Sequence, residues 1–115
     1  MFTSNSFAEW EKVSENLQGI FYVDFEEIKK VDGYVYWWEL GDFRKPSQKG
    51  TLSAQVYNQG DCENFRFKSL SFSFHKESMG KGTGVTDNIP DELWAYPPPN
   101  TSGETILTAV CAYAN

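Results

Sequence analysis

Two cysteines, Cys62 and Cys111, place the strongest constraint on how this chain of 115 residues folds. Cys62 lies in a turn-forming stretch before a long predicted strand, and Cys111 lies near the C-terminus on a predicted helix. We expect a Cys62–Cys111 disulfide that ties the helix to the start of this strand; the alternative is two inert buried thiols. The bond would close a loop of about 50 residues, which adds at most about 4 kcal/mol to the free energy of unfolding.

The content of apolar and aromatic residues favours one β-rich domain. Hydrophobic residues make up 40% of the chain and aromatic residues 17%, so much of the core material is ring-bearing and suited to strands. The length suffices for one domain but not for two. No apolar run approaches the ~20 residues that a bilayer-crossing helix needs, which predicts no membrane-spanning segment.

The formal net charge of -6 argues against polyanionic partners. Ten Lys and Arg residues face sixteen Asp and Glu residues, and no run of basic residues occurs. Nucleic acid and anionic lipid are therefore poor candidate ligands, because both need clustered positive charge. The first ten residues lack the basic and apolar regions of a signal peptide. The chain therefore either stays inside the cell or is a mature chain with an added initiator Met.

Alternating hydrophobic residues predict strands that are joined by turns. Strand patterns cover residues 10–13, 20–24, 34–40, 51–57 and 65–74, and Asp32-Gly33 is a strong turn signal before the third of them. Consecutive strands with turn-rich links predict an antiparallel meander sheet of about four to six strands. Residues 25–30 fit one helical turn and a loop equally well.

The strand at 65–74 has apolar residues of both parities: Phe65 and Phe67, followed by Leu70, Phe72 and Phe74. A regular strand would send these two groups to opposite faces of the sheet. A β-bulge near Lys68–Ser69 would bring all five onto one buried face. The alternative is a bent strand whose two ends serve different layers.

The C-terminal segment predicts a helix with a defined start. Thr101 is a good N-cap, and Glu104 three residues later completes a capping box. Ile106, Leu107, Val110 and Cys111 then span an arc of about 140° at 100° per residue. The predicted fold class is α+β, with this helix packed on one face of the sheet and tied by the disulfide. We expect residues 1–8 to be a flexible arm and residues 9–115 to form the single domain.

No group of residues predicts catalysis or a cofactor. His75 is the single histidine, and zinc needs three or four His or Cys ligands. A Cys–His nucleophilic pair would need a reduced cysteine. The stretch 79–84, MGKGTG, lacks the Walker spacing because Lys81 is followed by Gly82, so it is best read as a hairpin link. We expect no enzyme activity, cofactor, metal or nucleotide.

The strand at 34–40 carries large apolar side chains on both of its faces, and one helix covers only one of them. Either a curled sheet closes the second face with the N-terminal arm and loops, or that face binds a partner or a second copy. If the helix packs against Tyr36, Trp38 and Leu40, the candidate interface consists of Tyr34, Val35 and Trp37. A homodimer through this surface is the preferred form, because a two-fold contact lets one patch cover itself.

Taken together, these features resemble the surface-adhesin protein E-like family of bacteria. The resemblance covers residues from about 9 to 113 and rests on Trp10, Val13, Tyr22-Val23-Asp24, Ile28, Trp38, Leu40, Asp42, Asp61-Cys62, Arg66, Met79-Gly80-Lys81-Gly82, Trp94 and Cys111. Members of this family are small secreted or lipid-anchored proteins with an antiparallel sheet, a C-terminal helix and a disulfide. The type member is an adhesin that binds host matrix and plasma proteins and can dimerise.

The resemblance implies a non-enzymatic, extracytoplasmic protein-binding module of a bacterial envelope. Such a module would be periplasmic, anchored to the outer membrane or secreted, and its partner would be another protein or a second copy. The alternative function is a structural or assembly subunit of an envelope or secreted particle without a host ligand. Fold alone does not decide between these two functions.

Overall fold

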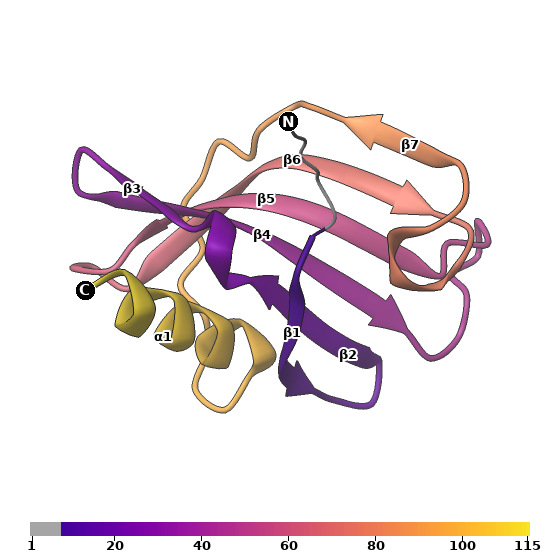
Figure 1. Cartoon of the computed structure of the whole chain (residues 1–115), viewed down its shortest axis with the longest axis horizontal. Coiled ribbons are helices and arrows are strands. Elements are labelled where there is room, and N and C mark those ends of the chain that lie inside the picture. The colour runs from indigo at the N-terminus through magenta and orange to yellow at the C-terminus, as the bar shows by residue number, and fades with distance from the viewer. Residues whose placement is uncertain (1–7) are drawn as a thin grey trace, which may run out of the picture.

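The computed structural model describes residues 8–115, in which seven antiparallel strands form one sheet beside an α-helix (Figure 1). The elements are β1 Trp10–Glu15, β2 Gly19–Asp24, the 3-10 turn η1 Phe25–Glu27, β3 Lys29–Val31, β4 Tyr34–Phe43, β5 Ser53–Asp61, β6 Arg66–His75, the 3-10 turn η2 Ser78–Gly80, β7 Gly84–Asp87 and α1 Ser102–Ala114. The strand order is β1-β2-β4-β5-β6-β7, and β3 pairs with β4. Residues 1–7, most of the predicted arm, lie outside the described residues.

The predicted fold class is confirmed: an antiparallel sheet, a C-terminal helix and a disulfide between them. The sheet has seven strands rather than the expected four to six, because two short strands were not predicted. β3 pairs with β4 over three residues, and β7 pairs with β6 over four. Neither short strand has the alternation of apolar residues from which the longer strands were predicted.

α1 packs on the face of the sheet that bears Val35 and Trp37. The core here consists of Val23, Val35, Trp37, Ile106, Leu107 and Val110. Val35 is 2% exposed and Trp37 is 1% exposed. Gly60 on the neighbouring strand β5 leaves room for this contact, because a Cβ atom there would lie 2.7 Å from the Trp37 ring and 3.2 Å from Leu107.

The prediction that Val35 and Trp37 belong to an exposed interface is therefore wrong. The helix was expected on the side of Tyr36 and Trp38, but it covers the opposite side. Tyr34, the third residue of that candidate interface, is half-buried and stacks on Trp94, with ring centroids 5.7 Å apart. The physical reason is the shape of the sheet surface: on the Val35 side, a glycine gives the Trp37 ring and the helix space to interlock.

Two bonds predicted from the sequence, the Thr101 cap and the Cys111 disulfide, fix the start and the end of α1. The Glu104 backbone N–H donates to Thr101 Oγ1 at 3.3 Å, and the Asn100 backbone N–H donates to Glu104 Oε1 at 2.9 Å. The second bond of the cap thus comes from the residue before the N-cap. Near the other end of the helix, Cys111 forms the predicted disulfide with Cys62, and their Cα atoms lie 5.8 Å apart.

The pairing of β5 with β6 is interrupted by a bulge at Leu70. Tyr57 pairs with Ser71 and Asn58 pairs with Ser69, so Leu70 has no partner on β5. The predicted position, Lys68–Ser69, is wrong by one residue, because pairing continues regularly through Ser69. A bulge adds one residue to one strand and so reverses the parity of every position that follows.

The bulge places the phenylalanines before and after it on one face, as predicted. Phe67 pairs with Gly60 and Phe74 pairs with Ala54, two β5 residues of the same parity. Their burial is lower than expected: Phe67 is half-buried and Phe74 is 39% exposed. The reason is the position of α1, which contacts β1 and β4 rather than the β6 side of the sheet.

A carboxyl group lies next to the buried Trp37 ring. Glu39 Oε1 accepts hydrogen bonds from Trp37 Nε1 at 3.0 Å and from Asn58 Nδ2 at 2.8 Å. Ser69 Oγ donates to Asn58 Oδ1 at 2.7 Å, which continues this polar chain onto β6. Burial of the Glu39 carboxyl group raises its pKa to about 7, although the hydrogen bond from Trp37 acts in the opposite direction.

Cys111→Ala should lower the free energy of unfolding by about 4 kcal/mol at most, because the unfolded chain regains the freedom of a loop of about 50 residues. Urea unfolding of both proteins without reductant measures this difference. Peptide mapping of the unreduced wild-type chain should also yield a linked Cys62–Cys111 peptide. Full alkylation of both thiols in native protein would contradict the bond.

Glu39 should make stability depend on pH. Its pKa is about 7 in the folded chain against the ordinary 4.5, so the folded state holds the proton across this interval. The free energy of unfolding should be highest below pH 4.5 for this group and fall by roughly 3 kcal/mol as pH rises through 7. Glu39→Gln keeps the acceptor oxygen and should remove this fall. Urea unfolding at pH 5 and pH 8 tests it, and an unchanged pH dependence in the variant would refute the assignment.

Candidate binding surfaces

The face of the sheet opposite α1, called the outer face below, carries three neighbouring aromatic side chains. Tyr36 and Trp38 alternate along β4 with the buried Val35 and Trp37. Tyr57 of β5 lies beside both: its ring centroid is 6.1 Å from that of Tyr36 and 4.9 Å from that of Trp38. All three side chains are half-buried. Tyr36, Trp38 and Tyr57 are called the aromatic row below.

A second aromatic contact on the outer face is formed by Tyr34 and Trp94. The Trp94 ring has Arg66 Cζ 4.4 Å and Lys68 Nζ 4.6 Å from its centroid. The segment that contains Trp94 is held to β6 by two backbone hydrogen bonds between Phe67 and Ala95, of 2.9 and 2.8 Å. Both cations therefore contact a ring of their own chain, which makes this end of the outer face a fixed part of the fold.

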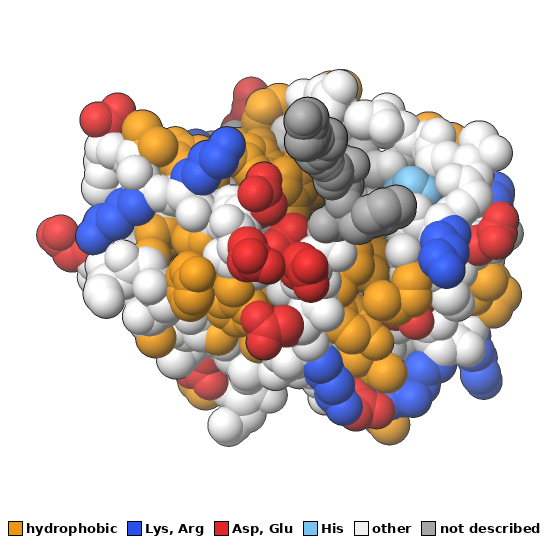
Figure 2. Space-filling view, viewed as in Figure 1, with side chains coloured by type: hydrophobic (Ala, Val, Ile, Leu, Met, Phe, Trp, Pro, Cys, Tyr) orange, Lys and Arg blue, Asp and Glu red, His pale blue; other side chains and the backbone are white. Residues whose placement is uncertain are grey.

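Acidic side chains border the aromatic row. Burial raises the pKa of Tyr57, and the nearby Tyr36 and Glu27 raise it further. Glu26 and Glu27 are exposed on η1. Figure 2 shows acidic side chains gathered near the middle of the visible face, over β1 and η1. A surface that meets the aromatic row would therefore also meet negative charge.

The glycine-rich segment after β6 covers one end of the outer face. The Met79 N–H donates to Asp42 Oδ1 at 2.9 Å, and the Gly80 N–H donates to Ser53 Oγ at 2.8 Å. η2 packs on β4 and β5, where Leu40 is fully buried. These backbone donors bind side chains of the sheet, which agrees with the interpretation of this segment as a structural link rather than a phosphate loop.

His75 and the cysteines are both engaged in structural contacts. His75 is 8% exposed, and its Nε2 lies 2.8 Å from Ser73 Oγ. Both cysteines belong to the disulfide, so neither is available as a nucleophile beside His75. Within residues 8–115, no three His, Cys, Asp or Glu side chains are grouped so that they could hold a metal ion.

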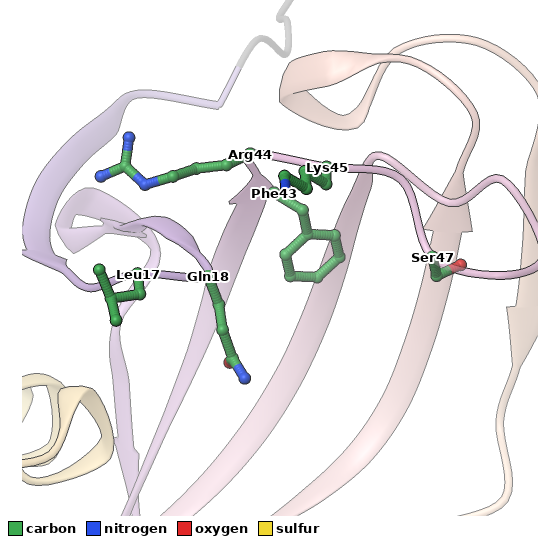
Figure 3. A pocket seen from close by; sticks show the side chains of 6 residues that line it. All are labelled: Leu17, Gln18, Phe43, Arg44, Lys45 and Ser47. Carbon is green, nitrogen blue, oxygen red and sulfur yellow. The ribbon is translucent and has the colours of Figure 1, made fainter.

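A hollow of about 500 Å³ lies at the end of the sheet where the β1–β2 turn meets the β4–β5 loop (Figure 3). It is lined by Leu17, Gln18, Phe43, Arg44, Lys45 and Ser47. Figure 3 shows Gln18 and Phe43 pointing in a common direction, while Arg44 extends towards β1. The sequence analysis missed this site because its residues come from two segments far apart in the chain; Leu17, an apolar residue inside a polar turn, was the available signal.

Comparisons with known proteins agree on one family. The family model described as Surface-adhesin protein E matches residues 10–112. Crystal form II of Haemophilus influenzae protein E superposes with a TM-score of 0.72 at 17% sequence identity, covering 98% of this chain and 95% of that chain. The structure of protein E from non-typeable Haemophilus influenzae gives a TM-score of 0.67 at 17% identity, covering 96% of this chain and 80% of that chain. The search of curated protein sequences finds no match.

Because their sequence identity is low, the solved structures show only that the fold is shared. The family model shows that the chain belongs to the family. Across residues 8–115, no helix combines the length and the apolar character that crossing a membrane requires. The predicted family resemblance is confirmed, and it extends over nearly the whole chain. The chain belongs to the surface-adhesin protein E family and is an adhesin-like bacterial surface protein.

Proposed function

We propose that this chain is a non-enzymatic, extracytoplasmic protein-binding module of a bacterial envelope that binds its partner through the outer face of the sheet. The observation that carries the proposal is the aromatic row, in which two tyrosines and a tryptophan lie side by side on a partly accessible sheet face. Tyr and Trp provide large contact areas with few rotatable bonds, and they dominate protein interfaces. Family membership supports the adhesin-like role.

The geometry of the row favours a protein over a sugar as the ligand. The Tyr36 and Tyr57 ring centroids are 6.1 Å apart with planes inclined by 23°, and Gln59 Nε2 donates to the Tyr36 hydroxyl at 3.1 Å, so neighbours in the sheet already contact these rings. Rings that contact each other leave less open face, whereas a sugar ring binds best on an open aromatic face. Side chains of a protein surface can fill the spaces between such rings.

The charge around the row favours a partner with a basic surface. Glu27, whose charge acts on Tyr57 of the row, is exposed, and the chain has a net charge of -6. A basic partner would associate faster, and salt would weaken the association. Two copies of this chain would bring like charges together, so a different protein is the preferred partner and a homodimer is the second form of this proposal. The module would act in the periplasm, at the outer membrane or after secretion.

Trp38→Ala should weaken binding at least about tenfold, because a central interface tryptophan contributes strongly when it is desolvated. The measurement is binding of the purified chain to surfaces coated with basement-membrane extract or with plasma proteins, at low and high salt. Tyr113→Ala is the matched control, because Tyr113 is 59% exposed on α1, away from the outer face. Circular dichroism and the melting temperature establish that each variant is folded.

Light scattering across micromolar concentrations runs in parallel with the binding assay. A dimer that Trp38→Ala dissociates would support the homodimer form. Equal binding by wild type and Trp38→Ala would rule out the aromatic row as the binding surface. If the chain shows no binding and no self-association, the alternative is favoured, namely a structural or assembly subunit without a host ligand.

A further inference from the structure

Leu17 is the most exposed large apolar side chain in the described part of the chain, with 95% of its surface accessible. It lies in the β1–β2 turn, which is closed by its neighbour: Asn16 Oδ1 accepts from the backbone N–H groups of Gln18 at 2.8 Å and Gly19 at 3.2 Å. The Asn16 N–H also donates to the Gly19 carbonyl at 2.9 Å. These hydrogen bonds fix the backbone of the turn in a conformation that exposes the Leu17 side chain to water.

Positive charge gathers around this turn only in the folded chain. Lys12, Arg44, Lys45, Lys49 and Lys76 belong to this end of the sheet, together with the acids Glu15, Asp42 and Glu77. Figure 2 shows Lys and Arg side chains at the lower right, where Figure 1 places the β1–β2 turn and the β4–β5 loop. The sequence analysis argued against anionic lipid because no basic run exists, but a run is not needed when the fold assembles the cluster.

Contacts between the two segments hold the cations beside Leu17. Arg44 Nε donates to the Asn16 carbonyl at 3.2 Å, and its guanidinium group pairs with Glu15. Lys12 Nζ lies 2.6 Å from the same carboxylate, so two cations share one acid. Hydrogen bonds from Lys12 and Arg44 lower the pKa of Glu15, as a positive environment requires. Lys45 adds its charge on the wall of the hollow, next to the Phe43 ring.

We propose that the β1–β2 turn and the β4–β5 loop form a docking site for an anionic lipid surface, with Leu17 entering the acyl boundary and Arg44 and Lys45 meeting headgroup phosphates. The hollow of about 500 Å³ between them has the apolar Phe43 beside two cations, which suits a phosphate joined to an apolar chain. A free phosphate would use the cations alone. An exposed apolar residue flanked by cations is the combination that binds at membrane interfaces.

This site lies at the end of the sheet away from η1, so it goes beyond the proposed protein-binding function. One group of acidic side chains lies elsewhere, over β1 and η1 (Figure 2), and Glu15 at the basic end is paired with Lys12 and Arg44. The uneven charge distribution would orient the molecule with its basic end towards the lipid and leave the aromatic row free for a protein. One chain would then connect a membrane surface to a protein partner.

The test is co-sedimentation of the full chain with vesicles of phosphatidylcholine alone or of phosphatidylcholine mixed with phosphatidylglycerol. The chain should bind the vesicles that contain phosphatidylglycerol, and high salt should release it. Lys45→Glu should weaken this binding at least about tenfold, because a favourable charge becomes an unfavourable one. Leu17→Ser should weaken it at least about fivefold through lost apolar burial. Because Leu17 is 95% exposed, its substitution should leave the melting temperature unchanged.

Two control variants separate the site from bulk properties. Lys29→Glu makes the same change in net charge on β3, and Leu93→Ser removes another apolar side chain that is 82% exposed. Neither should alter vesicle binding. The proposal is overturned if phosphatidylcholine vesicles bind equally well, if Lys29→Glu acts as strongly as Lys45→Glu, or if neither vesicle binds. Competition by soluble glycerol phosphate at equal phosphate concentration would replace the lipid surface with a free phosphate ligand. Trp38→Ala should leave vesicle binding intact, so the two proposals fail independently.

Discussion

The packing of α1 over Trp37 is the contact on which the arrangement of the whole sheet depends. Trp37 is 1% exposed, and Leu107 of the helix, beside it, is fully buried. Because side chains alternate along a strand, burying Trp37 turns Tyr36 and Trp38 to the opposite face in the same step. The aromatic row is thus a consequence of how the core is built. Its position follows from one tryptophan and the glycine that faces it.

The disulfide acts on this contact from a turn that is itself rigid. Asp61, 5% exposed, accepts from Asn64 Nδ2 at 2.9 Å and from Arg66 Nε at 2.8 Å. These bonds lower the pKa of Asp61, and the hydrogen bond from Asn64 contributes more than the one from Arg66. Cys62 follows Asp61 directly, so the covalent link to Cys111 starts from a part of the backbone that side chains already hold. A flexible anchor would have left the helix free to shift over Trp37.

Local signals in the sequence were sufficient for the five longer strands, the helix and the disulfide, but not for the short strands β3 and β7. Thr101 and Glu104 defined the start of the helix, and the change of parity between Phe67 and Phe72 identified a bulge to within one residue. The side on which the helix packs could not be decided in this way, because β4 is aromatic on both faces. That choice depends on Gly60 of the neighbouring strand, which leaves space on one face alone. Gly60 pairs with Val35 and is diagonal to Trp37, so a comparison of small residues with large rings on diagonal positions of neighbouring strands would have contained this information.

The candidate sites were harder to predict than the fold because each is assembled from distant segments. Tyr57 lies beside Tyr36 and Trp38 because β5 pairs with β4. Leu17 and Lys45 line the same hollow because the β1–β2 turn packs near the β4–β5 loop. A linear search for motifs examines neighbours in the chain, whereas these neighbours exist only in space. The net charge states the balance of charges that the chain carries but not where they lie in the fold. A basic region on an acidic protein therefore cannot be found from the net charge.

The place of Cys111 near the end of α1 has a mechanical consequence. A pull on the chain that follows Cys111 passes through the covalent bond before it reaches the earlier turns of α1. The force then enters the turn that joins the inner strands β5 and β6, and it bypasses the first turns of the helix. Unravelling from the C-terminal end, the easiest way to strip a terminal helix, is closed to this chain. A protein held at a surface under flow keeps its core covered for as long as that single bond remains oxidised.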